Sequence, residues 1–224
     1  MKTFPVSLVA LCLAFVLVAC GDLPAPPVPK EEVESTDIII GSKHRIQSDI
    51  LGEERAYWIS TPRHYDPSRK YPYVYLLDAR DHFEYAAGTL RKMGGIEIPE
   101  FILVGIPNTN RTRDLTPTHT LLAPDGSETE QFRASGGGDN FLAFIETELA
   151  PAVEADYPGE PYRMLIGHSF GGIFALHASL ERPDAFASFI VIDPSLWWDG
   201  GELITRLGQK AERRRDFRPS APTW

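Results

Sequence analysis

Six residues at positions 167–172, Gly-His-Ser-Phe-Gly-Gly, constrain the fold of this 224-residue chain more than any other part of its sequence. An apolar run at 162–166 precedes them and predicts a strand, and an apolar run at 173–178 follows them and predicts a helix. Glycines two positions before and two positions after Ser169 let a strand and a helix pass at close range. The pattern therefore predicts a sharp strand–turn–helix unit with Ser169 at its tip.

A serine at such a turn is a candidate nucleophile. Its backbone is strained and its hydroxyl stands at the start of a helix, whose N–H groups and dipole favour a nearby oxyanion. The same Gly-x-Ser-x-Gly pattern also occurs in glycine-rich turns that have no catalytic role, and the sequence leaves that alternative open. We expect Ser169 to be catalytic because the flanking strand and helix patterns are both present.

The composition suits one globular α/β domain, with 43% hydrophobic and 24% charged residues. The formal net charge of −9 argues against nucleic-acid binding. A basic cluster at 213–215 is interpreted as a solvated helix face or a tail. Three glycines at 136–138 lack the lysine and the strand of a phosphate-binding loop, so we interpret them as a flexible linker. The sequence indicates no cofactor and no metal site.

The first 19 residues have the pattern of a bacterial lipoprotein signal peptide. Lys2 supplies the positive start, the apolar stretch at 6–18 is too short to span a bilayer, and Leu-Val-Ala-Cys at 17–20 resembles a lipobox. We expect residues 1–19 to be removed and Cys20 to carry the lipid. The protein would then be anchored in the bacterial cell envelope, with the outer membrane favoured. A secretory signal cleaved elsewhere and an uncleaved anchor are the alternatives.

Residues 20–36 follow as a proline-rich segment, which predicts an extended tether between the lipid and the domain. The chain has two cysteines, Cys12 inside the signal peptide and Cys20 at the lipid site. The mature protein therefore has no pair of thiols for an intramolecular disulfide.

Strand and helix patterns alternate along residues 37–200, which indicates a largely parallel sheet flanked by helices. Residues 107–138 form a long polar stretch with little periodicity, of a length typical of loops that line a site. Strands are predicted at 37–40 and 43–48, 54–60, 73–78, 101–106, 162–166 and 187–192, and helices at 82–93 and at 141–153, the latter capped by Asp139 or Asn140.

Together with the turn at 167–172, three segments resemble the esterase D-like branch of the α/β-hydrolases. They are residues 72–78 (PYVYLLD), 110–118 (NRTRDLTPT) and 194–198 (PSLWW). The likeness runs from about residue 38 to about residue 199 and is strongest to siderophore esterases of the enterochelin-esterase type. The resemblance implies an α/β-hydrolase fold and a small-molecule ester as substrate.

The resemblance also implies roles for individual residues. Ser169 would form an acyl-enzyme, and the backbone N–H groups of Phe170 and Arg80 would bind the oxyanion. Ala79 stands where the family usually has glycine. Trp197 and Trp198 either line the acyl pocket or pack at the edge of the sheet. Three charged residues of the polar stretch are expected to fix it through ion pairs rather than touch substrate: Arg111, Arg113 and Asp114.

The acid and the base of a serine hydrolase are harder to find. The fold orders its triad as serine, acid and histidine, yet the only histidine after Ser169 is His177, eight positions along the next helix. We interpret His177 as an ordinary helix-face residue and His82 as the one weak substitute. Asp193 is the candidate acid, and Asp199 is a weaker one.

Residues 201–224 are dense in charge and then rich in proline, and they do not predict another strand-and-helix unit. We therefore expect a C-terminally shortened esterase that lacks the last strands and helix of the fold and is impaired in catalysis. Acyl transfer to an alcohol and ligand binding by a degenerate, non-catalytic hydrolase are the alternative functions.

Overall fold

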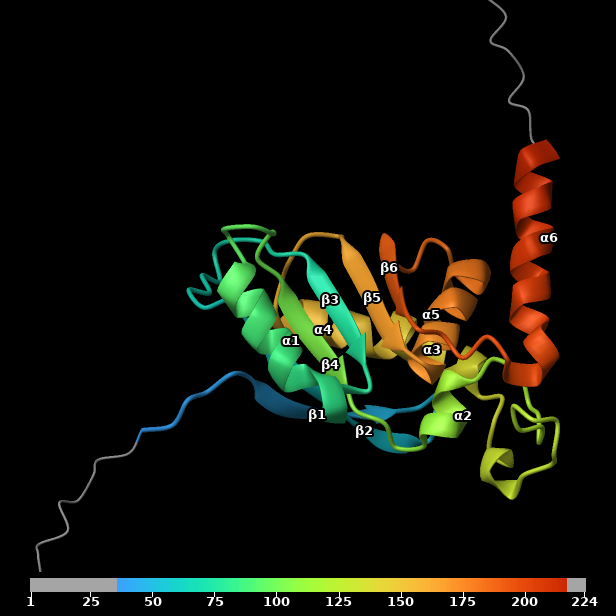
Figure 1. Cartoon of the computed structure of the whole chain (residues 1–224). Helices are drawn as coiled ribbons and strands as arrows, with labels where there is room; N and C mark the ends of the chain where they lie inside the picture. Colours follow the sequence, from blue (N-terminus) through green and yellow to red (C-terminus); the bar gives the residue numbers. More distant parts are fainter. Residues whose placement is uncertain (1–35, 217–224) are drawn as a thin grey trace, which may run out of the picture. The chain divides into compact units, whose positions relative to one another are not determined.

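A computed structural model describes residues 36–216 (Figure 1). The chain divides into two units, Met1–Ile38 and Ile39–Trp224, and every described helix and strand belongs to the second unit. The predicted signal peptide, Cys20 and the tether up to residue 35 lie outside the described residues, as do residues 217–224.

Six strands form one sheet in the order β1-β2-β4-β3-β5-β6. The strands β4, β3, β5 and β6 run parallel to one another. At one side of the sheet β2 pairs antiparallel with β4, and β1 pairs antiparallel with β2. This mostly parallel sheet confirms the predicted fold class. The strands are β1 Ser42–Ser48, β2 Glu53–Ser60, β3 Tyr73–Leu77, β4 Ile102–Ile106, β5 Arg163–His168 and β6 Ser188–Ile192.

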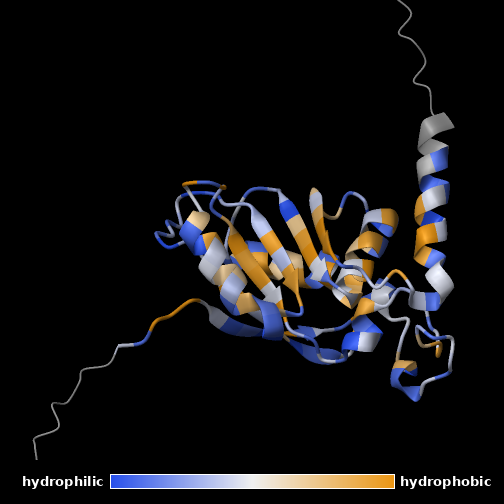
Figure 2. Cartoon of the chain, viewed as in Figure 1, coloured by the Kyte–Doolittle hydropathy of each residue, from blue (hydrophilic) through white to orange (hydrophobic). Residues whose placement is uncertain are grey.

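Helices cover both faces of the sheet, as the nearly continuous apolar runs of β3 and β4 require (Figure 2). On one face, α1 packs Phe83 and Ala87 against Val74, Leu76 and Leu103. On the other face, α3, α4 and α5 enclose the larger core. The helices are α1 Ala79–Met93, α2 Arg111–Leu115, α3 Gly138–Phe144, α4 Ala150–Asp156, α5 Phe170–Glu181 and α6 Glu202–Asp216, and a π-helical segment, Ile145–Leu149, joins α3 to α4.

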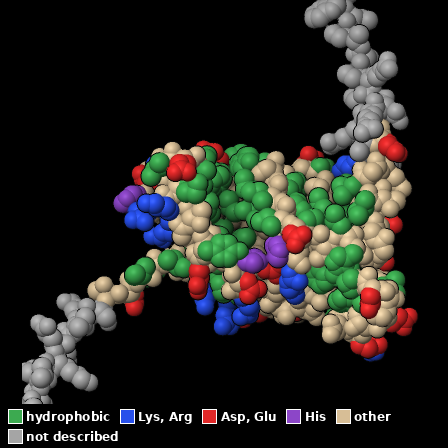
Figure 3. All heavy atoms as spheres, viewed as in Figure 1, with side chains coloured by type: hydrophobic (Ala, Val, Ile, Leu, Met, Phe, Trp, Pro, Cys, Tyr) green, Lys and Arg blue, Asp and Glu red, His purple; other side chains and the backbone are tan. Residues whose placement is uncertain are grey.

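The α1 face remains open over β5 and β6. Ile190 and Ile192 of β6 are 42% and 48% exposed. Together with Met164 and Ile166 of β5, Ile190 lines an apolar groove of about 800 Å³. Figure 3 shows the corresponding patch of hydrophobic side chains on this face. The patch is continuous with the core that α1 covers, because Met164 and Ile166 also pack against that core.

The structure corrects three sequence predictions. Residues 37–40 are not a strand, and Ile39 is 73% exposed before β1 begins at Ser42. The helix predicted from residue 82 begins at Ala79, directly after β3 and Asp78. Neither Asp139 nor Asn140 caps the next helix, because α3 begins at Gly138 with Gly137 as its N-cap. Asp139 instead binds His177, which the local sequence pattern does not reveal.

The charge-dense segment after residue 201 forms α6, which the sequence did not predict. Leu203 is buried, and Leu207 packs against the main core one helical turn later. Arg206 pairs with Glu181 of α5, and the Lys210 ammonium donates to the carbonyl of Ser179 at 3.2 Å. A narrow apolar stripe and a few polar contacts therefore dock a mainly charged helix on α5.

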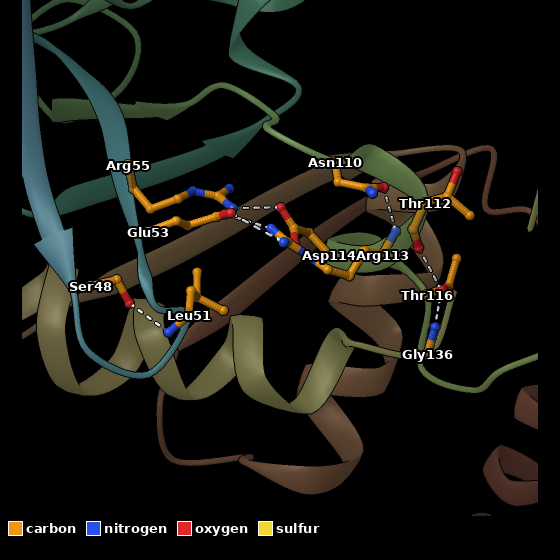
Figure 4. A network of polar contacts seen from close by, with 10 residues as sticks. All are labelled: Ser48, Leu51, Glu53, Arg55, Asn110, Thr112, Arg113, Asp114, Thr116 and Gly136. Carbon is orange, nitrogen blue, oxygen red and sulfur yellow. Dashed lines mark hydrogen bonds and ion pairs between the residues drawn. The ribbon is translucent and has the colours of Figure 1, made fainter. Parts of the chain in front are cut away.

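A buried ion-pair network fastens the long polar loop to the sheet (Figure 4). The Arg55 side chain of β2 is fully buried and donates to Asp114 of α2 at 2.7 Å and to Glu53 at 2.9 Å. Arg113 spans the same carboxylates, with Nε 2.7 Å from Asp114 and Nη2 2.6 Å from Glu53. This arrangement confirms that Arg113 and Asp114 fix the loop through ion pairs.

The glycines at 136–138 are part of the same structure and are not a flexible linker. Gly136 has φ +92, and its N–H donates to the Thr116 hydroxyl at 2.8 Å. The Gly138 N–H donates to the Thr116 carbonyl at 3.0 Å, and an added Cβ at Gly138 would lie 2.8 Å from that same oxygen. Gly137 and Gly138 pass directly against the end of α2, at Arg113 and Thr116, whereas Gly136 has a positive φ and passes against the backbone of His119.

Replacing Asp114 tests how strongly the loop depends on the buried pair. We expect Asp114→Ala to lower the free energy of unfolding by about 3 kcal/mol, because it leaves the Arg55 charge buried without its closest partner. Urea unfolding followed by circular dichroism measures the change. Glu54→Ala is the matched control, since it removes an exposed pair with Arg45 and should cost less than about 1 kcal/mol. Equal losses in the two variants would contradict the prediction.

The pH dependence of stability tests the same network through Glu53. The hydrogen bond from Arg113 holds the pKa of Glu53 below its ordinary value of 4.5, against the opposing effect of burial. A lowered folded-state pKa gives stability that is present above the ordinary pKa and is lost as the pH falls through the lowered one. We therefore expect Glu53→Gln and Arg113→Gln each to flatten the fall of the urea midpoint below about pH 5. A fall as steep as in the wild type would argue against this role for Glu53.

Candidate active site

Ser169 occupies a strained turn between β5 and α5. Its backbone has φ 56 and ψ −114, a combination that a residue with a side chain rarely adopts. Neighbouring segments hold it there. The Ser169 N–H donates to the Ile192 carbonyl at 3.1 Å, and the Ser169 carbonyl accepts from the Ser195 N–H at 3.2 Å and from the Ile173 N–H at 3.1 Å. Hydrogen bonds to the end of β6 and to the segment after it therefore hold the backbone of Ser169 in this conformation.

The flanking glycines are required by close backbone contacts. A Cβ on Gly167 would collide with the carbonyl of Gly171 across the turn. A Cβ on Gly172 would lie 2.9 Å from the Pro194 Cα and 3.1 Å from the Ile192 carbonyl oxygen. The motif thus has the geometry that its sequence predicts, and Ser169 is a partly exposed residue at the N-terminus of α5.

The parallel sheet brings the ends of several strands to the same edge as Ser169. Leu76 of β3 pairs with Ile166 of β5, and His168 of β5 pairs with Ile192 of β6. Asp78 follows β3 in a left-handed conformation with φ 52, and α1 begins at the next residue. The proposed oxyanion donors both lie at this edge, Phe170 as the first residue of α5 and Arg80 in the first turn of α1. Their roles stay predictions.

An ion pair between Asp78 and Arg111 connects the loops around the serine. The Asp78 side chain is 2% exposed, and it accepts from Arg111 Nε at 2.8 Å and Nη2 at 2.9 Å. Asn108, after β4, donates to the same carboxylate. The Arg111 guanidinium also lies 5.0 Å from the centre of the Phe170 ring, and its Nη2 is 3.5 Å from the carbonyl of His168. Arg111 therefore acts through an ion pair, as the sequence predicted.

Four aromatic rings cluster beside the elbow: Phe132, Phe170, Trp197 and Trp198. Trp198 is 2% exposed and its indole N–H donates to the Thr118 carbonyl at 3.2 Å, so it packs in the core. Trp197 is 39% exposed and lies 5.9 Å from the Phe170 ring. Of the two tryptophans, only Trp197 is exposed at this cluster, and its role as a pocket residue stays a prediction.

Ser195 is a site residue that the sequence reasoning missed. Its hydroxyl lies 3.1 Å from the Ser169 hydroxyl, and its side chain is buried. Asp78 and Asn108 were missed as well. All three share one signal, since each is a polar residue within three positions of the carboxyl end of a parallel strand.

All six histidines of the sequence lie in the part of the chain that the structure describes, and no hydrogen bond joins any of them to Ser169 there. His177 is not an ordinary helix-face residue, because it is 3% exposed and its Nε2 lies 2.7 Å from the Asp139 carboxylate. His82 bonds to the Tyr85 hydroxyl at 2.5 Å and stands 5.8 Å from the His168 ring. His119 bonds to Ser135.

Asp193 follows β6 as an exposed residue with φ 39, and its role as the acid stays a prediction. In the segment from 36 to 216, no three His, Cys, Asp or Glu side chains come together as a metal site. No helix of that segment combines the length and the hydropathy of a membrane span.

Comparisons with known proteins agree with this geometry. A family model described as "Putative esterase" matches residues 48–223. The ferri-bacillibactin esterase BesA of Bacillus subtilis is 35% identical over 178 residues, which are 72% of this chain and 61% of that protein. The siderophore triacetylfusarinine C esterase of Aspergillus fumigatus is 32% identical over 225 residues, 91% of this chain and 69% of that protein.

Among solved structures, an IroE-like serine hydrolase from Shewanella oneidensis is 40% identical, with a TM-score of 0.74 over 77% of this chain and 56% of that chain. The fold and the elbow thus define an α/β-hydrolase with a serine at the nucleophile position. The chain belongs to the esterase family that the matching model describes, and its likeness to siderophore esterases is confirmed. It spans less than two thirds of the length of the Bacillus and Shewanella relatives.

A pair of glycine substitutions tests the elbow. We expect Gly167→Ala to lower the free energy of unfolding by about 3 kcal/mol, because the new methyl group meets backbone that cannot move without opening the turn. Gly88→Ala in α1 is the control, since it has open space around it and should raise stability by about 0.5–1 kcal/mol. Urea unfolding of both variants checks the pair. A Gly167→Ala protein as stable as the wild type would show that the turn is looser than this geometry.

Proposed function

We propose that the protein is a carboxylic-ester hydrolase that uses Ser169 as its nucleophile. The observation that carries this proposal is the strained conformation of Ser169, a partly exposed residue directly before the first residue of α5. Such strain persists only where surrounding contacts enforce it, and it typically marks a functional residue. Membership of the esterase family supports the same chemistry.

The residues suggest the following sequence of steps. The Ser169 oxygen attacks the ester carbonyl carbon, and the carbonyl oxygen becomes an oxyanion held by the N–H groups of Phe170 and Arg80. Collapse of the tetrahedral species expels the alcohol and leaves an acyl group on Ser169. Water then attacks the acyl-enzyme and releases the acid. Each step needs a group that takes the serine or water proton and returns it to the leaving oxygen.

The substrate class we propose is a siderophore-type ester with aromatic acyl groups. The relatives named as siderophore esterases support the class. The aromatic cluster around Phe170 offers the half-exposed ring of Trp197 for stacking against an aryl group. Long-range attraction does not contribute, because siderophore esters are acidic and the chain carries a net charge of −9.

We further propose that the protein is held at the periplasmic face of a bacterial membrane, favouring the outer one, by lipid on Cys20. The support is the sequence pattern at 17–20 and the proline-rich segment that follows it. Mass spectrometry of the mature N-terminus checks this, since a diacylglyceryl cysteine at position 20 is the expected product.

The proton acceptor is the missing part of this site. Within residues 36–216, none of the six histidines bonds to Ser169, whose hydroxyl lies 3.1 Å from the hydroxyl of Ser195. The hydroxyl of Ser195 is too weak a base to take the proton of the Ser169 hydroxyl. We therefore propose that the chain is impaired in catalysis. The same observation favours a second candidate function, a non-catalytic lipoprotein that binds siderophore-type ligands.

Hydrolysis of p-nitrophenyl butyrate tests the impaired-esterase proposal. We expect slow turnover that Ser169→Ala abolishes and that free imidazole accelerates, because imidazole supplies the absent base. Oxyanion stabilisation and substrate binding alone accelerate the reaction roughly 10³–10⁴-fold over its rate in water. Ser179→Ala on the same helix is the control and should behave as the wild type. Turnover at ordinary enzymatic rates that depends on Ser169 would contradict the impairment.

A fluorophosphonate probe separates catalysis from mere binding. Covalent labelling of Ser169 is expected if the hydroxyl retains nucleophilic character, even at a low rate. Tight binding of a siderophore ester without labelling, and without hydrolysis in the presence of imidazole, would favour the binding lipoprotein. Butyryl transfer to added alcohol at the expense of free butyrate would instead identify an acyltransferase.

A further inference from the structure

A basic cavity of about 640 Å³ lies at the end of the sheet opposite Ser169. Three segments that meet at this end line it: the loop after β2, the last turn of α1 and the residues just before β4. Ser169 follows the carboxyl end of β5, whereas Phe101 and Glu100 precede the amino end of the parallel strand β4. The cavity is therefore separate from the elbow and from every residue proposed for ester hydrolysis.

The charge in this cavity is strongly positive. Arg63, Arg69, Arg91 and Lys92 line it together with His64, and Glu100 is the one carboxylate in its lining. Arg69 lies 2.8 Å from Glu100 and neutralises it. Three cationic side chains remain for a ligand, on a chain whose net charge is −9. Cations gathered against the sign of the whole molecule point to an anionic ligand.

Helix electrostatics explain only part of this cluster. Arg91 and Lys92 stand in the last turn of α1, where cations offset the helix dipole. Arg63 and His64 belong to the loop after β2, so the dipole does not account for their presence. The helix end itself is not a strong negative centre, because the Leu90 and Met93 carbonyls accept backbone N–H groups of the following turn.

Apolar groups accompany the cations. The lining includes Leu90, Phe101 and Leu103, and Ile96 at its rim is 80% exposed. The apolar groove of about 800 Å³ shares Arg69, Leu90 and Phe101 with the cavity. Figure 3 shows Lys and Arg side chains gathered beside this hydrophobic patch. Cations next to exposed aliphatic side chains are the pattern of surfaces that bind the headgroup region of a membrane.

The N-terminal entry of the domain lies at the same cavity. The Ser60 hydroxyl, which lines the cavity, donates to the Ile40 carbonyl at 2.5 Å. Ile40, near the N-terminus of the described residues, therefore contacts a residue that lines this cavity.

We propose that this cavity binds the phosphodiester headgroup of an anionic phospholipid and orients the domain with Ser169 away from the bilayer. The orientation rests on the proposed anchoring at Cys20, whereas headgroup binding does not. The Arg63, Arg91 and Lys92 side chains pair with the phosphate, and Ile96 enters the headgroup region.

Vesicle sedimentation of the full chain tests the cavity. We expect the wild type to bind vesicles that contain phosphatidylglycerol more tightly than pure phosphatidylcholine vesicles, with a preference that shrinks at high salt. Removing one cation near the membrane surface weakens such binding about fivefold. In the double variant Arg63→Ala/Arg91→Ala, the preference for phosphatidylglycerol vesicles should therefore fall roughly 25-fold. Arg45→Ala, an exposed cation of β1 outside the cavity, is the matched control and should keep it.

A second measurement needs no variant. Acetylation of Lys92 by a soluble active ester, followed by mass spectrometry, should slow with phosphatidylglycerol vesicles and not with phosphatidylcholine vesicles. An absent preference, an equal loss in Arg45→Ala, or unchanged acetylation of Lys92 would each overturn the proposal. Inorganic phosphate that binds the wild type as tightly as the vesicles do, and displaces it from them, would assign the cavity to a free anion instead.

Two further variants separate headgroup binding from the proposed esterase activity at Ser169 and from the proposed lipid anchor at Cys20. Ser169→Ala should keep the phosphatidylglycerol preference while it loses esterase activity. Cys20→Ala should lose affinity for both vesicle types if the cysteine is lipidated, yet keep the ratio between them. Loss of the ratio in Cys20→Ala would show that the preference arises from the anchor and not from the cavity.

Discussion

The strained backbone of Ser169 is the constraint on which the rest of the site depends. A residue held at φ 56 and ψ −114 costs of order 1–3 kcal/mol, and that cost must be offset by neighbours. Hydrogen bonds to Ile192, Ser195 and Ile173 supply this support, and the glycines at 167 and 172 remove the side chains that would block it. The chemistry of the serine is thus coupled to the packing of β6 and of the segment after it.

The ion pair of Asp78 and Arg111 extends this order to the neighbouring loops. In the parallel sheet, the carboxyl ends of β3, β4 and β5 lie at the same end of the sheet. Ladder hydrogen bonds join these strands to one another but do not extend into the loops that follow them. Arg111 joins Asp78 after β3 to His168, the last residue of β5. The Arg55–Asp114 pair ties the short helix that carries Arg111 to β2. A long polar loop therefore becomes part of the rigid frame around Ser169.

The sequence predicted those parts whose signal is local. The strands around residues 73–78 and 101–106, the elbow and the helix after it follow from apolar runs and glycine spacing within about 15 residues. What it missed depends on distant partners. The glycines at 136–138 are required by close contacts with residues 113–119. Asp139 binds His177 across 38 positions, and α6 forms where Leu203 and Leu207 meet the core. Ser195 becomes a site residue only once β6 lies beside β5.

The exposed apolar surface and part of the support of Ser169 occur at the same strand, β6. β6 is the last strand in the order of the described sheet, and Ile190 and Ile192 leave apolar surface exposed there. Each such side chain forgoes part of the 1.5–3 kcal/mol that full burial gives, and an unpaired strand edge invites association. The backbone of the same strand holds Ser169 through the Ile192 carbonyl. The packing of β6 therefore bears on the stability of the sheet and on the conformation of Ser169 together.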